Sequence, residues 1–247
     1  MDKSIYVAMT GARAAMQSQA VIAHNLANAN STGFRAVRQS LESAPIQGVG
    51  LDSRVNALAQ PESWDSSAGE YVLTGEALDI AVLGEGWIAV EDANGQEAYT
   101  RAGNLHLTSS GVLETAEGQV VLGLAGPVTL PAFSELTIKG DGQISVVPQG
   151  STANNVAVVN TLKLVNPPNS ELTRFEDGLF RLKDGSSAPA DPLVRIASGQ
   201  LEGSNVNTTG ALVDMIAAAR HYELHVRAMS NAEENDQVAT SLMRMNG

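Results

Sequence analysis

The 247-residue sequence contains no cysteine, which excludes disulfide bonds, thiol catalysis and thiolate zinc sites. Basic residues are also few: 15 Lys and Arg stand against 27 Asp and Glu, for a formal net charge of −12. This balance repels phosphate and disfavours a nucleic-acid-binding protein or a protein bound to an anionic membrane. No run approaches the roughly 20 apolar residues that cross a bilayer, and residues 1–30 lack the apolar core of a cleavable signal peptide. We therefore expect neither direct membrane insertion nor a cleaved signal peptide.

Aromatic residues make up only 4% of the chain, whereas there are 23 glycines, a composition that suits many turns and thin packing layers. With 43% hydrophobic and 17% charged residues, the chain is globular rather than disordered. Its acidity lies in the middle. Residues 1–38 contain one acidic and four basic residues, residues 39–210 carry a net charge of −13, and residues 211–247 carry −2. The two ends are therefore built differently from the centre.

The N-terminal end is predicted to be a helix, because small and apolar residues recur at alternating steps of four and three. Gly11 is its single poor helix former, and Asn, Ser, Thr and Gly residues predict that it stops near Ala29. The positions of this N-terminal seam are Ile5, Met9, Ala12, Met16, Gln19, Ala23 and Leu26.

The C-terminal end shows the same spacing, and Thr208 or Thr209 is the expected helix cap. Continuing the register would place Glu233 on the seam, so we expect a phase shift of the stripe near Ala232. Stripes this narrow need a partner, either the helix at the other end of the chain or a neighbouring subunit. A monomer whose terminal helices cover a sheet is the alternative. The positions of this C-terminal seam are Leu212, Met215, Ala219, Tyr222, Val226 and Met229.

The centre is predicted to be β structure, because short apolar runs alternate with glycine-containing turns and no long amphipathic helix interrupts them. Asn94-Gly95, Asp141-Gly142 and Asp184-Gly185 are typical of hairpin turns. The predicted fold class is α+β: an antiparallel β domain, sandwich-like or barrel-like, flanked by N- and C-terminal helices that pair as a coiled coil. We divide the chain into residues 1–34 (N-terminal helix and motif), 35–74 (extended connector with one or two strands), 75–200 (β domain) and 201–247 (C-terminal motif and helix).

No pattern in the sequence indicates catalysis. His221 and His225 lie four residues apart, but the metalloprotease motif needs Glu directly after the first His, and Tyr222 stands there. The segment 84–86, Gly-Glu-Gly, lacks the remaining elements of a phosphate-binding loop and is predicted to be a turn between strands. No serine stands in a Gly-x-Ser-x-Gly elbow. We therefore predict a protein that is not an enzyme and has no cofactor and no metal. A hydrolase with a β domain and a secreted β-rich binding module are the alternatives from other classes.

Three segments resemble motifs of the bacterial flagellar rod and hook proteins. The first closes the N-terminal helix, where this family has Ala-Asn-x-x-Thr-x-Gly-Phe/Tyr; Ser31 replaces Thr and keeps the hydroxyl. The second comprises residues 75–90 and 99–104. The third precedes the C-terminal helix, with Thr208 where relatives often have Pro. The motif residues are Asn25, Leu26, Ala27, Asn28, Ser31, Gly33 and Phe34 at the N-terminal end, and Leu201, Glu202, Gly203, Ser204, Asn205 and Val206 at the C-terminal end.

This resemblance implies a structural subunit of the flagellar basal body. Rod subunits stack into a hollow shaft that crosses the periplasm, transmits torque and encloses the export channel, with the terminal helices inside and the β domain outside. The partners it implies are copies of the same chain, other rod proteins and the flagellar type III export apparatus, which exports family members without a cleaved signal. Within the family the sequence is most similar to the proximal-rod members, and the distal-rod paralogue is the alternative.

Overall fold

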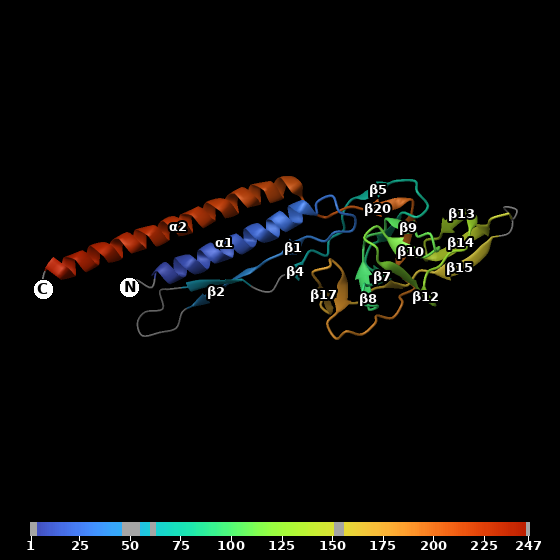
Figure 1. Cartoon of the computed structure of the whole chain (residues 1–247), viewed down its shortest axis with the longest axis horizontal. Helices are drawn as coiled ribbons and strands as arrows, with labels where there is room; N and C mark the ends of the chain where they lie inside the picture. Colours follow the sequence, from blue (N-terminus) through green and yellow to red (C-terminus); the bar gives the residue numbers. More distant parts are fainter. Residues whose placement is uncertain (1–3, 46–54, 60–62, 151–155, 246–247) are drawn as a thin grey trace. The chain divides into compact units, whose positions relative to one another are not determined.

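The computed structural model describes residues 4–45, 55–59, 63–150 and 156–245. The described residues form two compact units (Figure 1). The helix unit is drawn from residues 1–29, 36–65 and 206–247, and the β body from residues 30–35 and 66–205. Both units are therefore assembled from segments that are far apart in the sequence.

The first helix of the helix unit is α1 (Ser4–Ala27), which ends two residues before the predicted position. It is rich in alanine and contains no proline, as a stable helix requires. Ala8, Ala12 and Ala15 are buried on one face at steps of four and three. Small side chains let a second helix approach closely, and that helix is α2 (Thr208–Met245), which runs antiparallel beside α1 (Figure 1).

The packing of the helix pair explains why position 11 is a glycine. A Cβ atom placed on Gly11 would lie 2.3 Å from Cε1 of the His225 imidazole on α2. The histidine ring therefore occupies the space that any larger residue at position 11 would fill. The residue that weakens the isolated α1 helix thus permits close packing of the helix pair.

The helix α2 differs from its prediction in two respects. Asn207 caps it in place of Thr208 or Thr209: its Oδ1 accepts a hydrogen bond from the Gly210 N–H at 3.0 Å, which satisfies one of the free N–H groups of the first turn. The expected phase shift near Ala232 is also absent from the described part of α2. Ala232 is buried, Glu233 is exposed and Asp236 is half-buried, so the more buried positions keep their spacing of three and four through this region.

The helix unit also contains two short antiparallel ladders. They pair β1 (Val37–Arg38) with β4 (Ser63–Trp64), and β2 (Leu41–Pro45) with β3 (Val55–Ala59). Strand β3 also contacts α1. The segment 35–74, for which one or two strands were expected, contains β1 to β5 among its described residues.

The β body is antiparallel at every strand pair that the structure describes, as predicted. Its largest sheet has the order β17-β18-β8-β7-β11-β10-β9, with β12 added to β11 and β16 added to β7. The strands of this sheet are β7 (Trp87–Glu91), β8 (Glu97–Thr100), β9 (Leu105–Leu107), β10 (Leu113–Thr115), β11 (Val120–Gly123), β12 (Gly126–Pro127), β16 (Leu164–Val165), β17 (Leu172–Arg174) and β18 (Phe180–Leu182).

Three smaller sheets complete the β body. They are formed by β13 (Phe133–Ile138), β14 (Gln143–Pro148) and β15 (Ala157–Thr161), by β19 (Arg195–Ser198) with β6 (Ile80–Leu83), and by β20 (Gln200–Glu202) with β5 (Tyr71–Leu73). One hydrophobic core joins β6, β7, β11 and β14, and includes Ile88, Leu113 and Val121, all fully buried. The β body therefore has a core of its own.

Two of the three predicted hairpin turns are confirmed. Asn94-Gly95 connects the paired strands β7 and β8, and Asp141-Gly142 connects β13 and β14, with both glycines at positive φ. Asp184-Gly185 follows β18 and leads into the loop before β19, so the prediction of a third hairpin was wrong. The local turn chemistry is the same in all three, but β18 pairs with β17 and β8 instead of with the next strand.

Candidate functional site

The three sequence motifs meet at a buried cluster of charges in the β body. Glu202, from the C-terminal motif, lies at the end of β20 with its side chain fully buried. Its Oε1 lies 2.7 Å from Nη2 of Arg35, directly after the N-terminal motif, and its Oε2 lies 2.9 Å from Nη1 of Arg101, in the second motif. We call these three residues the triad. No sequence pattern predicted that these three charges would lie together.

Hydrogen bonds from the backbone surround the triad. The Gly69 N–H donates to Oε1 of Glu202 at 3.1 Å, and Arg101 donates through Nη2 to the Gly84 carbonyl at 2.6 Å. Arg35 donates through Nη1 to the Ser67 carbonyl. The Arg101 guanidinium also lies 5.4 Å from the centre of the Trp87 ring, a favourable cation–π distance. The charged groups are thus fixed from several segments of the chain.

The triad is not electrically balanced, because two guanidinium groups share one carboxylate. Burial lowers the pKa of Arg35, and the charge of Arg101 lowers it further, whereas the neighbouring Glu202 carboxylate raises it. The Nε atoms of Arg35 and Arg101 are buried without a hydrogen-bond partner. The two cations therefore share a single carboxylate, and the triad has one positive charge in excess.

The N-terminal motif fixes the end of α1 and the chain that follows. Asn25 forms two reciprocal bonds with Val37, accepting from its N–H and donating to its carbonyl, both at 2.8 Å. Asn28 donates to the His24 carbonyl at 2.9 Å. In the β body, Phe34 is buried beneath the guanidinium of Arg174, at 4.8 Å from the ring centre. Of the other motif residues, Gly33 is buried, Leu26 and Ser31 are half-buried and Ala27 is exposed.

The C-terminal motif forms hydrogen bonds with two neighbouring segments of the chain, around Gly33 and around residues 67–70. The Gly33 N–H donates to the Glu202 carbonyl at 2.7 Å, and the Gly203 N–H donates to the Glu70 carbonyl at 2.8 Å. Asn205 donates through Nδ2 to the Ser67 carbonyl at 2.9 Å. The remaining members, Leu201, Ser204 and Val206, are half-buried.

The N-terminal seam is only partly buried within the chain. Ala12 is buried, Ile5, Gln19 and Leu26 are half-buried, and Ala23 is exposed. The exposed fractions are 51% for Met9 and 57% for Met16, and Tyr6 of the same helix is also exposed. The role of these positions in assembly stays a prediction.

The C-terminal seam has the same character. Met215, Ala219 and Met229 are half-buried, whereas Leu212, Tyr222 and Val226 are exposed. Val213, Ile216 and Leu224 are further exposed apolar side chains that the predicted stripe did not include. Both helices therefore combine a packed face of small residues with an outer surface of larger apolar residues, and we call these outer residues the helix surface.

The two histidines of α2 and the segment 84–86 lie in different elements of the described structure. His221 is exposed and His225 packs on Gly11, and the described residues contain no group of three or more His, Cys, Asp or Glu able to hold a metal ion. The segment 84–86 is the turn between β6 and β7, as predicted. Neither described helix is long and apolar enough to cross a membrane.

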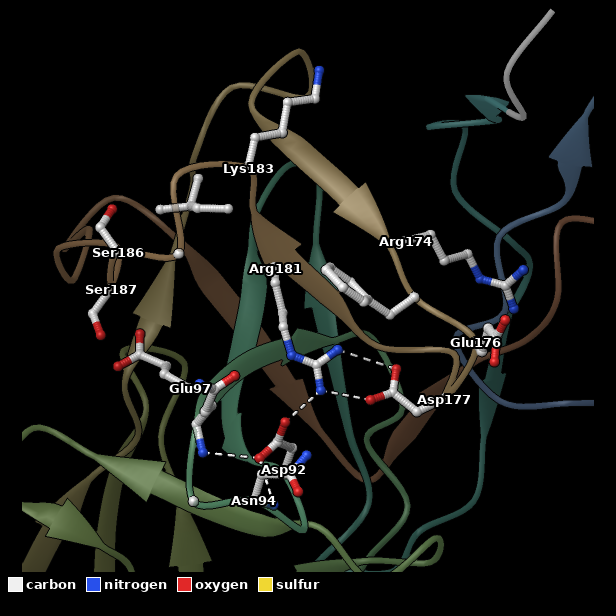
Figure 2. A pocket seen from close by; sticks show the side chains of 15 residues that line it. Asp92, Asn94, Glu97, Arg174, Glu176, Asp177, Arg181, Lys183, Ser186 and Ser187 are labelled. Carbon is white, nitrogen blue, oxygen red and sulfur yellow. Dashed lines mark hydrogen bonds and ion pairs between the residues drawn. The ribbon is translucent and has the colours of Figure 1, made fainter.

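The β body contains a cavity of about 930 Å³ beside the β7–β8 turn and strands β17 and β18. Figure 2 shows the side chains that line it. Arg181 lies at its centre, with Nη2 at 2.6 Å from Asp92 and 2.5 Å from Asp177, and stacks at 4.7 Å over the Phe175 ring. Burial would raise the pKa of Asp92, but hydrogen bonds from the Gln96 N–H and from Arg181 outweigh it and lower this pKa. One guanidinium thus bridges two carboxylates, which is typical of a structural ion-pair network.

Comparison with known families identifies the class of protein. Residues 5–35 match the family described as flagella basal body rod protein, and residues 81–146 match the flagellar hook protein FlgE/F/G D1 domain. Residues 197–242 match the flagellar basal body rod FlgEFG protein C-terminal family. Together with the full-length relatives below, these matches show that the chain belongs to the flagellar basal-body rod protein family.

Within that family the chain is similar to proteins named FlgF. It is 42% identical to the flagellar basal-body rod protein FlgF of Escherichia coli K12, over 99% of this chain and all of the relative. Identity and coverage are the same for FlgF of Salmonella typhimurium LT2. Identity to the flagellar basal-body rod protein FlgG of Agrobacterium fabrum C58 is 27%, over 98% of this chain and all of the relative.

Proposed function

We propose that the chain is a structural subunit of the proximal part of the flagellar rod. It assembles through its terminal helices, with copies of itself and with other rod proteins, into a hollow shaft that transmits torque and encloses the export channel. The observation that carries this proposal is the helix surface, on which Met9, Met16, Val213, Ile216 and Leu224 are all more than half exposed. The β body, in contrast, buries an extensive core.

Covering this surface contributes favourable free energy to assembly. Full burial of a Met, Val, Leu or Ile side chain stabilises a protein by about 1.5–3 kcal/mol. Covering the exposed half of each of these five side chains therefore contributes on the order of 1 kcal/mol apiece. Head-to-tail contacts that do not close into a ring generate a helical filament, the symmetry that a shaft requires.

The same family membership supports a proposal for the position in the rod and for the route to it. The higher identity to FlgF than to FlgG supports the proximal rod over the distal paralogue. We further propose that the subunit reaches the periplasm through the flagellar type III export apparatus without a cleaved signal peptide. Its role is structural and not enzymatic, and Arg181 in the cavity of Figure 2 is held between Asp92 and Asp177 in an ion-pair network.

The proposal is tested by Met16→Asp in a motile host from which the gene has been deleted. Met16 is suited to this test because it is 57% exposed on α1, so the change leaves the thermal unfolding of the purified chain unaltered. We expect cells with this variant to lose motility and to form basal bodies with incomplete rods in electron micrographs. Met16→Leu, which keeps the apolar contact, is the matched control and restores motility. Normal motility with Met16→Asp would contradict assembly through the helix surface.

A further inference from the structure

The triad connects three segments that are far apart in the sequence. Arg35 follows the N-terminal motif, Arg101 follows β8, and Glu202 ends β20. We infer that Glu202 is a positioning residue, which locks residues 30–35 and 202–205 into the β body through the two arginines. These segments are the parts of the β body that lead to and from the terminal helices. The inference concerns the interior of one chain and is independent of the proposed function.

The charge arrangement is the first support for this lock. The two carboxylate oxygens of Glu202 are divided between two arginines, one at 2.7 Å and the other at 2.9 Å, and all three side chains are at most 4% exposed. A buried ion pair is costly to break, because the remaining charge is left without a partner and without water. Neutralising Glu202 would leave two uncompensated cations, whereas removing Arg35 would leave one balanced pair.

The backbone around the triad is the second support. The Gly33 N–H binds the Glu202 carbonyl at 2.7 Å, and the Asn205 N–H binds the Phe34 carbonyl at 3.3 Å, so the first and last segments of the β body are joined directly. The approach is close enough to require glycine: a Cβ atom on Gly33, which has φ +67°, would lie 2.2 Å from the backbone carbon of Arg101. These two backbone bonds join the same segments that the triad joins through side chains.

The central strands of the hydrophobic core allow local opening at the triad to be distinguished from general destabilisation of the β body. Ile88, Val90 and Val121 lie on the central strands β7 and β11, and none of them belongs to the segments that the triad joins. We call the contact between residues 30–35 and residues 202–205 the junction. Opening of the junction would expose the amides of Gly33, Gly69 and Gly203 and leave those of the central strands protected. General destabilisation would affect both groups equally.

The test is hydrogen–deuterium exchange on the full chain carrying Glu202→Gln, which keeps the shape of the side chain. Loss of one partner of a buried pair predicts at least a 100-fold loss of protection at the Gly33, Gly69 and Gly203 amides. We expect protection in β7 and β11 to stay within about threefold of the unmodified chain. Unchanged protection at the junction, or an equal loss in the junction and the central strands, would overturn the inference.

Two further variants keep the test informative. Arg35→Met leaves the Glu202–Arg101 pair balanced, so we expect it to open the junction less than Glu202→Gln does; an equal or larger effect would contradict the lock. If Glu202→Gln does not fold, Glu202→Asp, which retains the charge, replaces it, and fully native exchange in that variant counts against the required geometry. The control is Glu97→Gln, which breaks the partly buried pair with Lys163 (2.7 Å) and leaves the junction closed.

Discussion

The contact between Gly11 and His225 predicts the effect of replacing Gly11 by alanine. Helix propensity would raise the free energy of unfolding, whereas tertiary packing would lower it. In a free helix, replacing glycine by alanine stabilises by about 1 kcal/mol. In this helix pair the new Cβ atom would lie 2.3 Å from Cε1 and 2.6 Å from Nδ1 of the imidazole, so the ring must move. Overpacking of this kind costs about 1–3 kcal/mol. We therefore expect Gly11→Ala to lower the free energy of unfolding by about 1 kcal/mol net.

The double mutant isolates the cause of this loss. When His225→Ala has removed the ring, Gly11→Ala is expected to stabilise by about 1 kcal/mol, which gives a coupling energy of about 2 kcal/mol between the two positions. The assay is urea unfolding of the full chain, followed by circular dichroism at 222 nm, which reports on α1 and α2. Gly210→Ala is the matched control, because its Cβ atom would come no closer than 3.4 Å to Asn207. Equal stabilisation by Gly11→Ala with and without His225 would refute the reasoning.

Two other predictions concern the β body. Leu113→Ala removes a fully buried core side chain and should lower the free energy of unfolding by about 2–5 kcal/mol, measured by urea unfolding with tryptophan fluorescence, whereas Leu193→Ala, at an 80% exposed position, should change it by less than about 0.5 kcal/mol. Burial, together with the charge of Glu97, raises the pKa of Tyr99 to about 12 from 10.0, although the hydrogen bond from the Ala188 N–H lowers it. The folded state thus retains this proton where the unfolded state has lost it, so the stabilisation is complete below pH 10 and is lost as the pH rises towards about 12. Phenolate absorbance should show one of the four tyrosines titrating near pH 12, and Tyr99→Phe should reduce the alkaline loss of stability; a native chain in which every tyrosine titrates near pH 10 would contradict this.

The terminal helices could be predicted from the sequence because their periodicity is local and extends over many turns. The face that each helix packs within the chain could not be predicted in the same way. Ala12 lies on the predicted stripe and is buried, but Met16 lies on the same stripe and is exposed. The predicted packing face followed the large apolar side chains, which lie on the exposed surface of the helices. The close contact between the helices uses alanine and glycine instead.

The β body shows the same division between local and distant information. The turns at Gly95 and Gly142 follow from residues adjacent in the chain, so they could be predicted. The triad depends on charges that are 66 and 101 positions apart along the chain, and no spacing rule reaches so far. The signal that could have pointed to it is that Arg101 and Glu202 are the sole charged residues of segments 99–104 and 201–206, with Arg35 immediately after the N-terminal motif.

The separation of the triad along the chain also fixes an order of events during synthesis. Closing a loop between Arg35 and Glu202, 167 residues apart, carries a length-dependent entropic cost of about 4.5 kcal/mol. Because a chain emerges from the ribosome N-terminus first, both arginines are made long before the carboxylate that neutralises them. The junction of the β body can therefore close only after Glu202 has been synthesised, long after both arginines. Until Glu202 has been synthesised, the nascent chain carries the positive charges of Arg35 and Arg101 without the carboxylate that pairs with them in the folded protein.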